Sequence, residues 1–216
     1  MSGFIANADD IPVVLLAGGR SSRMGANKAF VLLGGESLLA RITARIAKRQ
    51  THAVALNADA DWPDVMGLRL VPDKIPGKLG PLAGVLAAMQ DTALRYPQVS
   101  HVATIPIDSP FFPPDLLNRL AASVQGRDDI AIATSFDRDH PVFGVWPVST
   151  AADLETWIVT DAKRRVRDFL ARHTVRRVEF SAVETPIGPL DPFFNVNTPA
   201  DLMDAEKWLA ALESMS

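Results

Sequence analysis

Short apolar runs alternate along the chain with segments of helical periodicity. Residues 11–17, IPVVLLA, are almost continuously apolar, as the buried central strands of parallel sheets are. Residues 37–50 instead place Leu38, Leu39, Ile42 and Ile46 on one face of a helix. A buried strand followed by an amphipathic helix is therefore expected at the start of the chain.

The same alternation continues to the C-terminus. Further strands are predicted at 51–58, 68–73, 101–108, 129–136, 140–148 and 174–182, and further helices at 81–94, 113–124, 150–159, 162–173 and 198–214. Pro147 indicates the end of one strand, while Thr198 and Pro199 are suited to the N-cap and first turn of the last helix. The order predicts an α/β fold with a mostly parallel sheet and helices on both faces. One of the two strands after Asp129 could run antiparallel, and residues 1–216 are expected to form one domain.

Composition excludes several classes of function. The chain has 216 residues, a net charge of -3 and no cysteine. This charge gives no reason to expect nucleic-acid binding, and the lack of cysteine removes disulfides, thiolate zinc sites and cysteine nucleophiles. The N-terminus does not resemble a signal peptide, and no apolar run reaches the roughly 20 residues that span a bilayer. A cytoplasmic protein without a membrane partner is expected.

A cationic, glycine-rich loop follows the first strand. Gly18 and Gly19 would lie at the carboxyl edge of the sheet, where ligands of open α/β folds bind, and Arg20, Arg23 and Lys28 add positive charge. These features favour a ligand that carries phosphate. The loop matches neither the dinucleotide fingerprint nor the P-loop, and a solvated surface loop is the alternative.

Polar side chains are predicted at the ends of the other strands. Asp108 ends the strand at 101–108, where a carboxylate could hold Mg²⁺ together with substrate phosphates, or could cap the following helix. Asn57 and Asp73 close two further strands, and either could bind a base or ribose or could simply cap a strand end.

Other chemistries receive little support. The four histidines have no metal-ligand spacing; His52 and His101 are expected to be structural, and His140, in the polar turn DRDHPVF, is the histidine best placed for a site. The basic run around Lys163 and Arg165 is expected to be a solvated helix face. Ser21 and Ser22 have no adjacent base, so a nucleophilic serine is not indicated.

Several motifs together resemble those of one enzyme family. The loop LAGGRSSRMG with its lysine is similar to the signature of nucleotidyltransferases with a Rossmann-like, three-layer α/β fold. The additional motifs GPLAG (80–84), IDSPFFPPDLL, the pair His140–Pro141 and FNVNTPADL (194–202) resemble those of the molybdenum cofactor guanylyltransferases. The resemblance extends from about Val13 to Leu202.

The resemblance implies a reaction and a set of site residues. GTP and molybdopterin would give molybdopterin guanine dinucleotide and pyrophosphate, with Mg²⁺ as the cofactor. Catalysis would rest on Arg23, Lys28 and Asp108, with Asp108 as the metal ligand. The nucleotide would contact Leu16, Ala17, Gly18, Gly19, Lys28, Asn57, Asp73, Gly80 and Asp108, and molybdopterin would contact His140, Arg165, Asn195 and Asn197.

One departure and two alternatives accompany this interpretation. The family usually has aspartate before the loop lysine, whereas this chain has Asn27. Another nucleotidyltransferase, such as a molybdopterin cytidylyltransferase or a sugar-phosphate enzyme, is the nearer alternative. A non-catalytic module that delivers nucleotide or cofactor is the other. Molybdenum-cofactor biosynthesis proteins and molybdoenzyme chaperones are further candidate partners.

Overall fold

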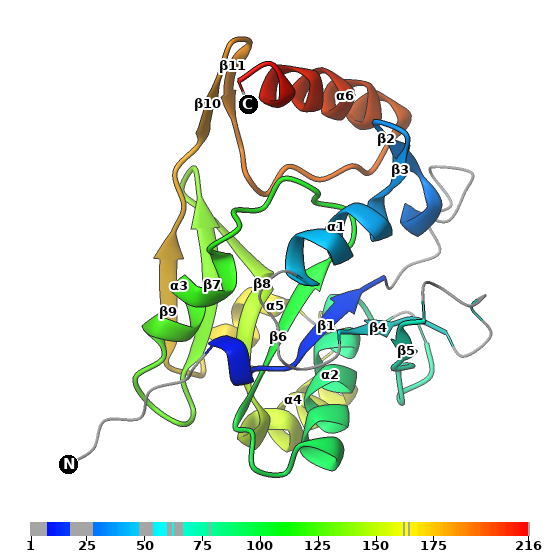
Figure 1. Cartoon of the computed structure of the whole chain (residues 1–216). Coiled ribbons are helices and arrows are strands. Elements are labelled where there is room, and N and C mark those ends of the chain that lie inside the picture. Colours follow the sequence, from blue (N-terminus) through cyan, green and yellow to red (C-terminus); the bar gives the residue numbers. More distant parts are fainter. Residues whose placement is uncertain are drawn as a thin grey trace.

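A seven-stranded sheet forms the centre of the computed structural model, which describes residues 8–17, 28–47, 54–59, 62, 67–77, 79–161, 163 and 165–215 (Figure 1). The strand order is β5-β4-β1-β6-β8-β7-β9. β8 pairs antiparallel with both of its neighbours, whereas all other pairs in this sheet are parallel. The strands are β1 (Val13–Leu16), β4 (Ala55–Asn57), β5 (Arg69–Leu70), β6 (His101–Pro106), β7 (Ile130–Ser135), β8 (Arg138–Pro147) and β9 (Val175–Glu179). The expected α/β fold is confirmed. One of the two strands after Asp129, β8, runs antiparallel, and it ends at Pro147 as predicted.

Helices follow the strands in the predicted order. They are α1 (Leu38–Ala47), α2 (Pro81–Arg95), α3 (Leu116–Ser123), α4 (Ala151–Thr160), α5 (Val166–Leu170) and α6 (Pro199–Glu213), with short 3₁₀ turns at Ala8–Asp10, Lys28–Phe30 and Val148–Thr150. The helix expected over 162–173 is wrong in extent, because Lys163 lies in a bend and α5 starts at Val166. Phe169 and Leu170 are the buried residues of α5. Lys163 and Arg165, which precede it, are exposed, so neither buries a side chain that would extend the helix.

Two hairpins were not anticipated from the sequence. They pair β2 (Leu32–Leu33) with β3 (Glu36–Ser37) and β10 (Val183–Thr185) with β11 (Gly188–Leu190). Strands of two or three residues are too short to show an alternating pattern, so periodicity could not detect them.

Strand β1 is buried on both of its faces. Val13 and Leu15 pack into one hydrophobic core, which also contains apolar residues of α1 and α3. Val14 and Leu16 pack into a second core with residues of α2, α4 and α5. Successive side chains of a strand point to opposite faces, so these two cores define a helix–sheet–helix sandwich.

A third, smaller core lies beyond the main sheet. Leu33 and Leu38 pack there with Leu190, Val196 and Leu209, which come from β11, the segment before α6, and α6 itself. Figure 1 shows α6 and the β10–β11 hairpin together at the top of the molecule, beyond the ends of β7 and β8. This core fixes residues 191–198 across the edge of the sheet.

The strand order places a switch point beside β1. The chain passes from β1 to β4 and β5 on one side and then returns to β6 on the other. Ligands of open α/β sheets bind beyond the carboxyl ends of strands at such a point. Ile107 N donates to Leu16 O at 3.2 Å, so the ends of β1 and β6 meet where the loop and Asp108 were predicted to meet.

The described part of the chain contains no helix that is both long and apolar enough to cross a membrane.

Asp129 lies directly before β7 and anchors the start of this strand, at the edge of the sheet opposite to the switch point. Its carboxylate accepts hydrogen bonds from Arg176 Nε at 2.9 Å and from the backbone N–H groups of Gln125 and Gly126 at 3.1 Å each. Burial by itself would raise the pKa of Asp129, but these hydrogen bonds and the charge of Arg176 lower it below its usual value. The ionised form is therefore favoured by folding.

Asp129→Asn should lower the free energy of unfolding by about 1.5–3 kcal/mol at neutral pH, because it removes a charge-assisted hydrogen-bond centre. A carboxyl group whose pKa is lowered in the folded state contributes stability above its unfolded pKa of about 3.9 and loses it as the pH falls further. Denaturant unfolding between pH 7 and pH 3 should therefore show a smaller loss of stability in the variant than in the wild type. Parallel pH curves would contradict this assignment.

Candidate active site

Lys28 joins segments that are far apart in the sequence. Its Nζ donates to Asp108 Oδ2 at 3.0 Å and also to Asn197 Oδ1. The side chains of Lys28 and Asp108 are 17% and 22% exposed, so this ion pair faces the surface without being freely solvated. An ammonium group has three N–H donors, and the contacts of Lys28 with the described residues use two of them.

The segment 194–197 is bound to the loop after β6. Val196 N donates to Asp108 O at 2.7 Å, and Ser109 Oγ donates to Asn195 Oδ1. Ser109 is fully buried. Asp108, Asn195 and Asn197, which were predicted from separate motifs, are thus brought together.

The alternative in which Asp108 caps a helix is wrong. The next helix, α3, starts at Leu116, and its N-cap residue is Asp115. The carboxylate of Asp108 instead binds Lys28 at the switch point.

A capping box fixes the turn that carries Asn197. Asp201 Oδ2 accepts from Asn197 N at 2.9 Å and from Thr198 N at 2.8 Å, while Asp201 N donates to Thr198 Oγ1 at 3.2 Å. Burial would raise the pKa of Asp201, but these hydrogen bonds, together with the charge of Lys28, lower it. Thr198 and Pro199 open α6 as predicted. The role of Asp201 was missed, although the sequence Thr-Pro-Ala-Asp contains the signal of a capping box.

Asn57 and Asp73 interact with each other. Asn57 Nδ2 donates to Asp73 Oδ1 at 2.8 Å and to Val71 O at 2.9 Å. Asn57 is only 2% exposed, whereas Asp73 is exposed. Both N–H groups of the amide are thereby used within the protein, so Asn57 orients Asp73 and connects the ends of β4 and β5.

The two glycines of the GPLAG motif, Gly80 and Gly84, have different structural roles. Gly80 is the N-cap of α2 and has a φ of 79°, which glycine adopts without strain. Gly84 lies within α2, and a Cβ at this position would be 2.5 Å from Asn57 Oδ1 and 3.1 Å from Leu16 Cδ2. The absence of a side chain thus lets α2 pack against the ends of β1 and β4. Leu16 and Ala17 are buried there, and Ala17 N donates to Asn57 O.

His140 belongs to a second polar cluster. Its Nε2 lies 2.8 Å from Ser135 Oγ, which donates to Asp191 Oδ1 at 2.8 Å. The imidazole ring also packs against Phe193, with ring centroids 4.6 Å apart. Burial lowers the pKa of His140 and so favours the neutral ring. Because the Ser135 hydroxyl donates to Asp191, it is not arranged as a nucleophile activated by the histidine.

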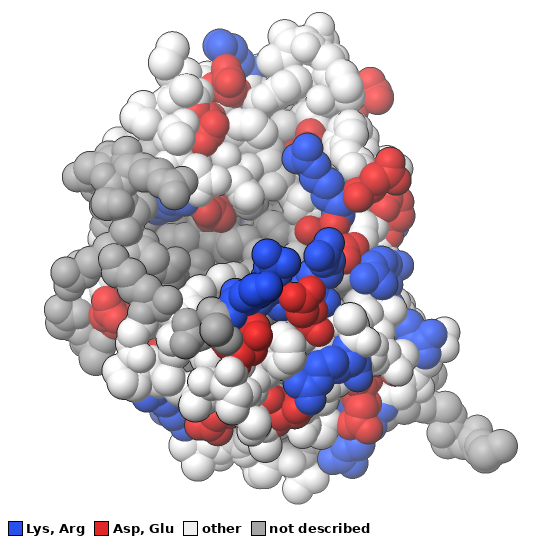
Figure 2. Space-filling model, turned by 180° about the vertical axis from the view of Figure 1, so that it is seen from behind, with Lys and Arg blue, Asp and Glu red and all other residues white. Residues whose placement is uncertain are grey.

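The remaining predicted residues either lie apart from these clusters or fall outside the described residues. Arg165 is the N-cap of α5 and is exposed, and within the described parts of the chain its side chain makes no hydrogen bond with His140, Asn195 or Asn197. Figure 2 shows Lys and Arg side chains gathered near the middle of one face, with Asp and Glu among them. Gly18, Gly19, Arg20, Arg23 and Asn27 lie outside the described residues, as does His52.

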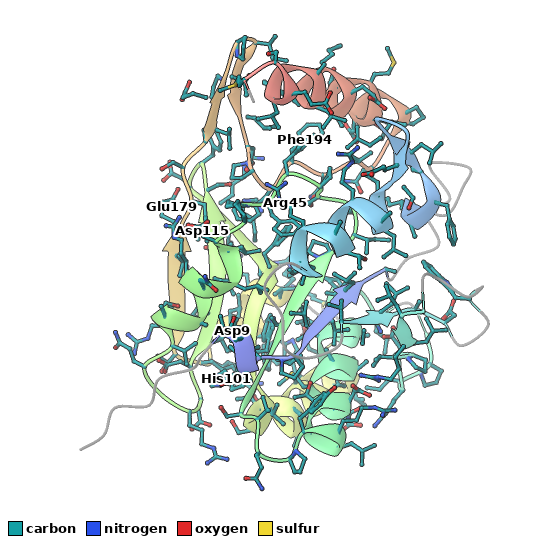
Figure 3. All side chains as sticks on the ribbon, viewed as in Figure 1. Asp9, Arg45, His101, Asp115, Glu179 and Phe194 are labelled. Carbon is teal, nitrogen blue, oxygen red and sulfur yellow. The ribbon has the colours of Figure 1, made fainter. Side chains whose placement is uncertain are left out.

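His101 has the expected structural role. Its Nδ1 lies 2.9 Å from Ser100 Oγ, and its Nε2 lies 3.2 Å from Asp129 O. Burial lowers the pKa of His101. Figure 3 labels it at the end of the sheet opposite to Phe194 and the candidate site.

The donor atoms at Asp108 suit a hard cation. Its carboxylate is partly exposed, and Oδ1 makes no hydrogen bond with any of the residues described. Those residues contain no group of three or more His, Asp or Glu side chains that could enclose a metal ion. Mg²⁺ is commonly held by one or two carboxylates and by substrate phosphates, so the residues present fit such an ion.

The fold and this cluster define the class of protein. A lysine, a carboxylate and an amide gather at the switch point of a mostly parallel sheet, as in an enzyme that handles nucleoside phosphates. The sequence profile of the MobA-like NTP transferase domain matches residues 13–178, and the chain belongs to this family. It is therefore a nucleotidyltransferase. This assignment replaces the alternative of a non-catalytic module that delivers nucleotide or cofactor.

Close relatives agree with this assignment. The chain is 70% identical to the molybdenum cofactor guanylyltransferase of Rhizobium rhizogenes (strain K84 / ATCC BAA-868), over 99% of each chain. It is 50% identical to the enzyme of the same name from Rhizobium meliloti (strain 1021), over 99% of this chain and 98% of the relative.

Solved structures of more distant proteins share the fold. Molybdopterin-guanine dinucleotide biosynthesis protein A from Archaeoglobus fulgidus superposes with a TM-score of 0.67 at 22% identity, over 93% of this chain and 99% of that one. Rv0371c from Mycobacterium tuberculosis H37Rv, in its complex with manganese, gives a TM-score of 0.61 at 17% identity, over 91% and 97% of the two chains.

Gly84→Ala should destabilise the protein and weaken nucleotide binding. Alanine in a helix interior is ordinarily favoured over glycine by about 1 kcal/mol. Here its methyl group would collide with buried Asn57 and Leu16, and such overpacking costs about 1–3 kcal/mol. Thermal unfolding and nucleotide titration would measure the two effects.

The double variant Asn57→Ala/Gly84→Ala supplies the matched control. Removing the Asn57 amide removes the closest contact, so the cost of Gly84→Ala should be smaller in the Asn57→Ala background. Equal costs in both backgrounds would show that the collision is not the cause.

Proposed function

We propose that the protein transfers GMP from GTP to the terminal phosphate of molybdopterin and releases pyrophosphate. The observation that carries the proposal is the Lys28–Asp108–Asn197 cluster at the switch point of the sheet. The similarity to enzymes named molybdenum cofactor guanylyltransferase supports the choice of both substrates.

The reaction requires little acid–base chemistry from the protein. An oxygen of the acceptor phosphate forms a bond to the α-phosphorus of GTP, while the bond from that phosphorus to the oxygen bridging to the β-phosphate breaks. Pyrophosphate leaves with that electron pair. A phosphate monoester has a second pKa of about 6, so the attacking oxygen is already ionised at neutral pH. The absence of an activated base in the described cluster is consistent with this reaction.

Positioning and charge neutralisation remain for the protein to supply. Within the described residues Lys28 uses two of its three N–H donors, on Asp108 and Asn197, and it would direct the third to a phosphate oxygen. Asp108 would hold Mg²⁺ through its carboxylate, and the bound ion would neutralise charge on the α-phosphate and the leaving group. Leu16, Ala17, Gly80 and Asp73 would line the nucleoside side.

The acceptor would approach from the side of segment 194–197. Asn195 and Asn197 are held there by Ser109 and Lys28, and the His140 cluster lies next along the same segment. Arg165, Gly18, Gly19 and Arg23 keep their sequence-based roles as predictions.

Asp108→Asn should lower the turnover rate by about 100-fold or more, because an amide of the same shape removes the charge that would hold the cation. The Mg²⁺ concentration for half-maximal rate should rise, while the unfolding temperature should change little. Asp115→Asn, the same substitution in the same loop, is the matched control and should keep its activity. Near-normal turnover by Asp108→Asn would refute the metal assignment.

The unmodified protein should use GTP in clear preference to CTP. Gly18 has no Cβ, so a purine can lie close to the backbone of the first loop. Pyrophosphate release with molybdopterin, Mg²⁺ and each of GTP, CTP, ATP and UTP would test this, with the product identified by mass. Gly18→Ala should reduce the preference for GTP over CTP, because the added methyl group would crowd a purine more than a pyrimidine. Equal or better use of CTP would instead support a cytidylyltransferase.

A further inference from the structure

A cavity of about 590 Å³ lies between α6, the β10–β11 hairpin and the turn from β7 to β8. Its volume falls within the range of about 300–1,000 Å³ that is typical of pockets for small molecules. Phe136, Phe194 and Trp208 contribute aromatic rings to its lining. Figure 3 labels Phe194 in the region between α6 and the main sheet. We call this space the aromatic cavity.

The rim of the aromatic cavity has an unusual backbone. Phe136 and Asp137 form the turn from β7 to β8 with φ values of 48° and 58°, in the left-handed region. Bulky residues rarely adopt this conformation, and residues held in it gather at binding sites. The side chain of Phe136 nevertheless stays at the surface, where the residue is 51% exposed. A ring kept in this position is available to contact a ligand.

The charged residues that line the aromatic cavity balance one another. Arg138 and Lys207 are matched by Asp191 and Asp204, and Lys207 Nζ donates to Asp204 Oδ1 at 2.7 Å. This balance favours a neutral ligand with polar edges over a second phosphate group. Asp191 Oδ1 accepts from Ser135 Oγ and from Phe193 N. Within the described residues Asp191 Oδ2 has no such donor, and it can accept an N–H from a ligand.

The aromatic cavity and the candidate active site share one segment of chain. Phe194 lines the cavity, and three residues further on Asn197 binds Lys28. Three residues of extended chain span at most about 11 Å. A ligand with a phosphate at Lys28 and a ring system on a short arm could therefore reach both places.

We propose that the aromatic cavity binds the pterin ring system of the acceptor substrate. The pyrimidinone ring of a pterin is flat, neutral and aromatic, so it can stack on aromatic side chains. Its amino and ring N–H groups complement a carboxylate such as Asp191. This inference rests on the proposed function, because it assigns a binding place to one part of the proposed acceptor.

Phe136→Asn tests the proposal most directly. Asparagine tolerates the left-handed conformation, so the variant removes the ring without requiring a new turn. The KM for molybdopterin should rise by about fivefold or more, as expected for the loss of one stacking partner, while the KM for GTP stays unchanged. Trp208→Leu should act in the same direction. Leu94→Asn, which changes another exposed apolar residue away from the cavity, should leave both KM values unchanged.

A binding measurement separates this proposal from the proposed function. Titration with 6-hydroxymethylpterin, which has no phosphate, should quench tryptophan fluorescence in the wild type and do so more weakly in Phe136→Asn. That result would support the aromatic cavity even if no nucleotide were transferred. Turnover with an unchanged KM for molybdopterin in Phe136→Asn would overturn the cavity assignment and leave the proposed function standing. A rise in the KM for GTP alone would also overturn it.

Discussion

Burial of β1 on both faces is the constraint on which the remaining structure depends. Val13 and Leu15 need one helical layer, and Val14 and Leu16 need another. A chain that covers both faces must lead strands away from β1 in both directions, and this produces a switch point beside it. The end of β1 meets the end of β6 at that point, beside the carboxylate of Asp108 and the ammonium group of Lys28. The position of the candidate active site thus follows from how the central strand is buried.

The third core extends this arrangement to a second substrate. Val196 and Leu209 pack beyond the sheet, and their burial holds segment 191–198 across its edge. One end of the segment presents Asn197 to Lys28, and the other contributes Asp191 and Phe194 to the aromatic cavity. The Lys28–Asp108–Asn197 cluster and the aromatic cavity are therefore linked by the same stretch of backbone.

Charges around the site are paired within the protein before any ligand binds. Asp108 pairs with Lys28, and Asp201 accepts two backbone N–H groups, which hold the turn at Asn197. Such pairing fixes the polar groups in place, so that less reorganisation would be needed for the proposed binding of phosphates. Asn57 is likewise fixed by a partner within the protein, because its amide donates to Asp73 and does not face the solvent.

The sequence by itself determined the layers, the order of the long elements and the edge at which the site lies, because strand and helix periodicities and strand-end residues are local signals. It also indicated Lys28, Asp108 and the FNVNTP segment through their resemblance to a family. Only the tertiary structure decided that Asp108 binds Lys28 and does not cap a helix, that Gly84 makes room for Asn57, and that α5 is short. The two small hairpins and the aromatic cavity were likewise beyond prediction. They depend on contacts between residues far apart in the chain, and no local pattern records those contacts.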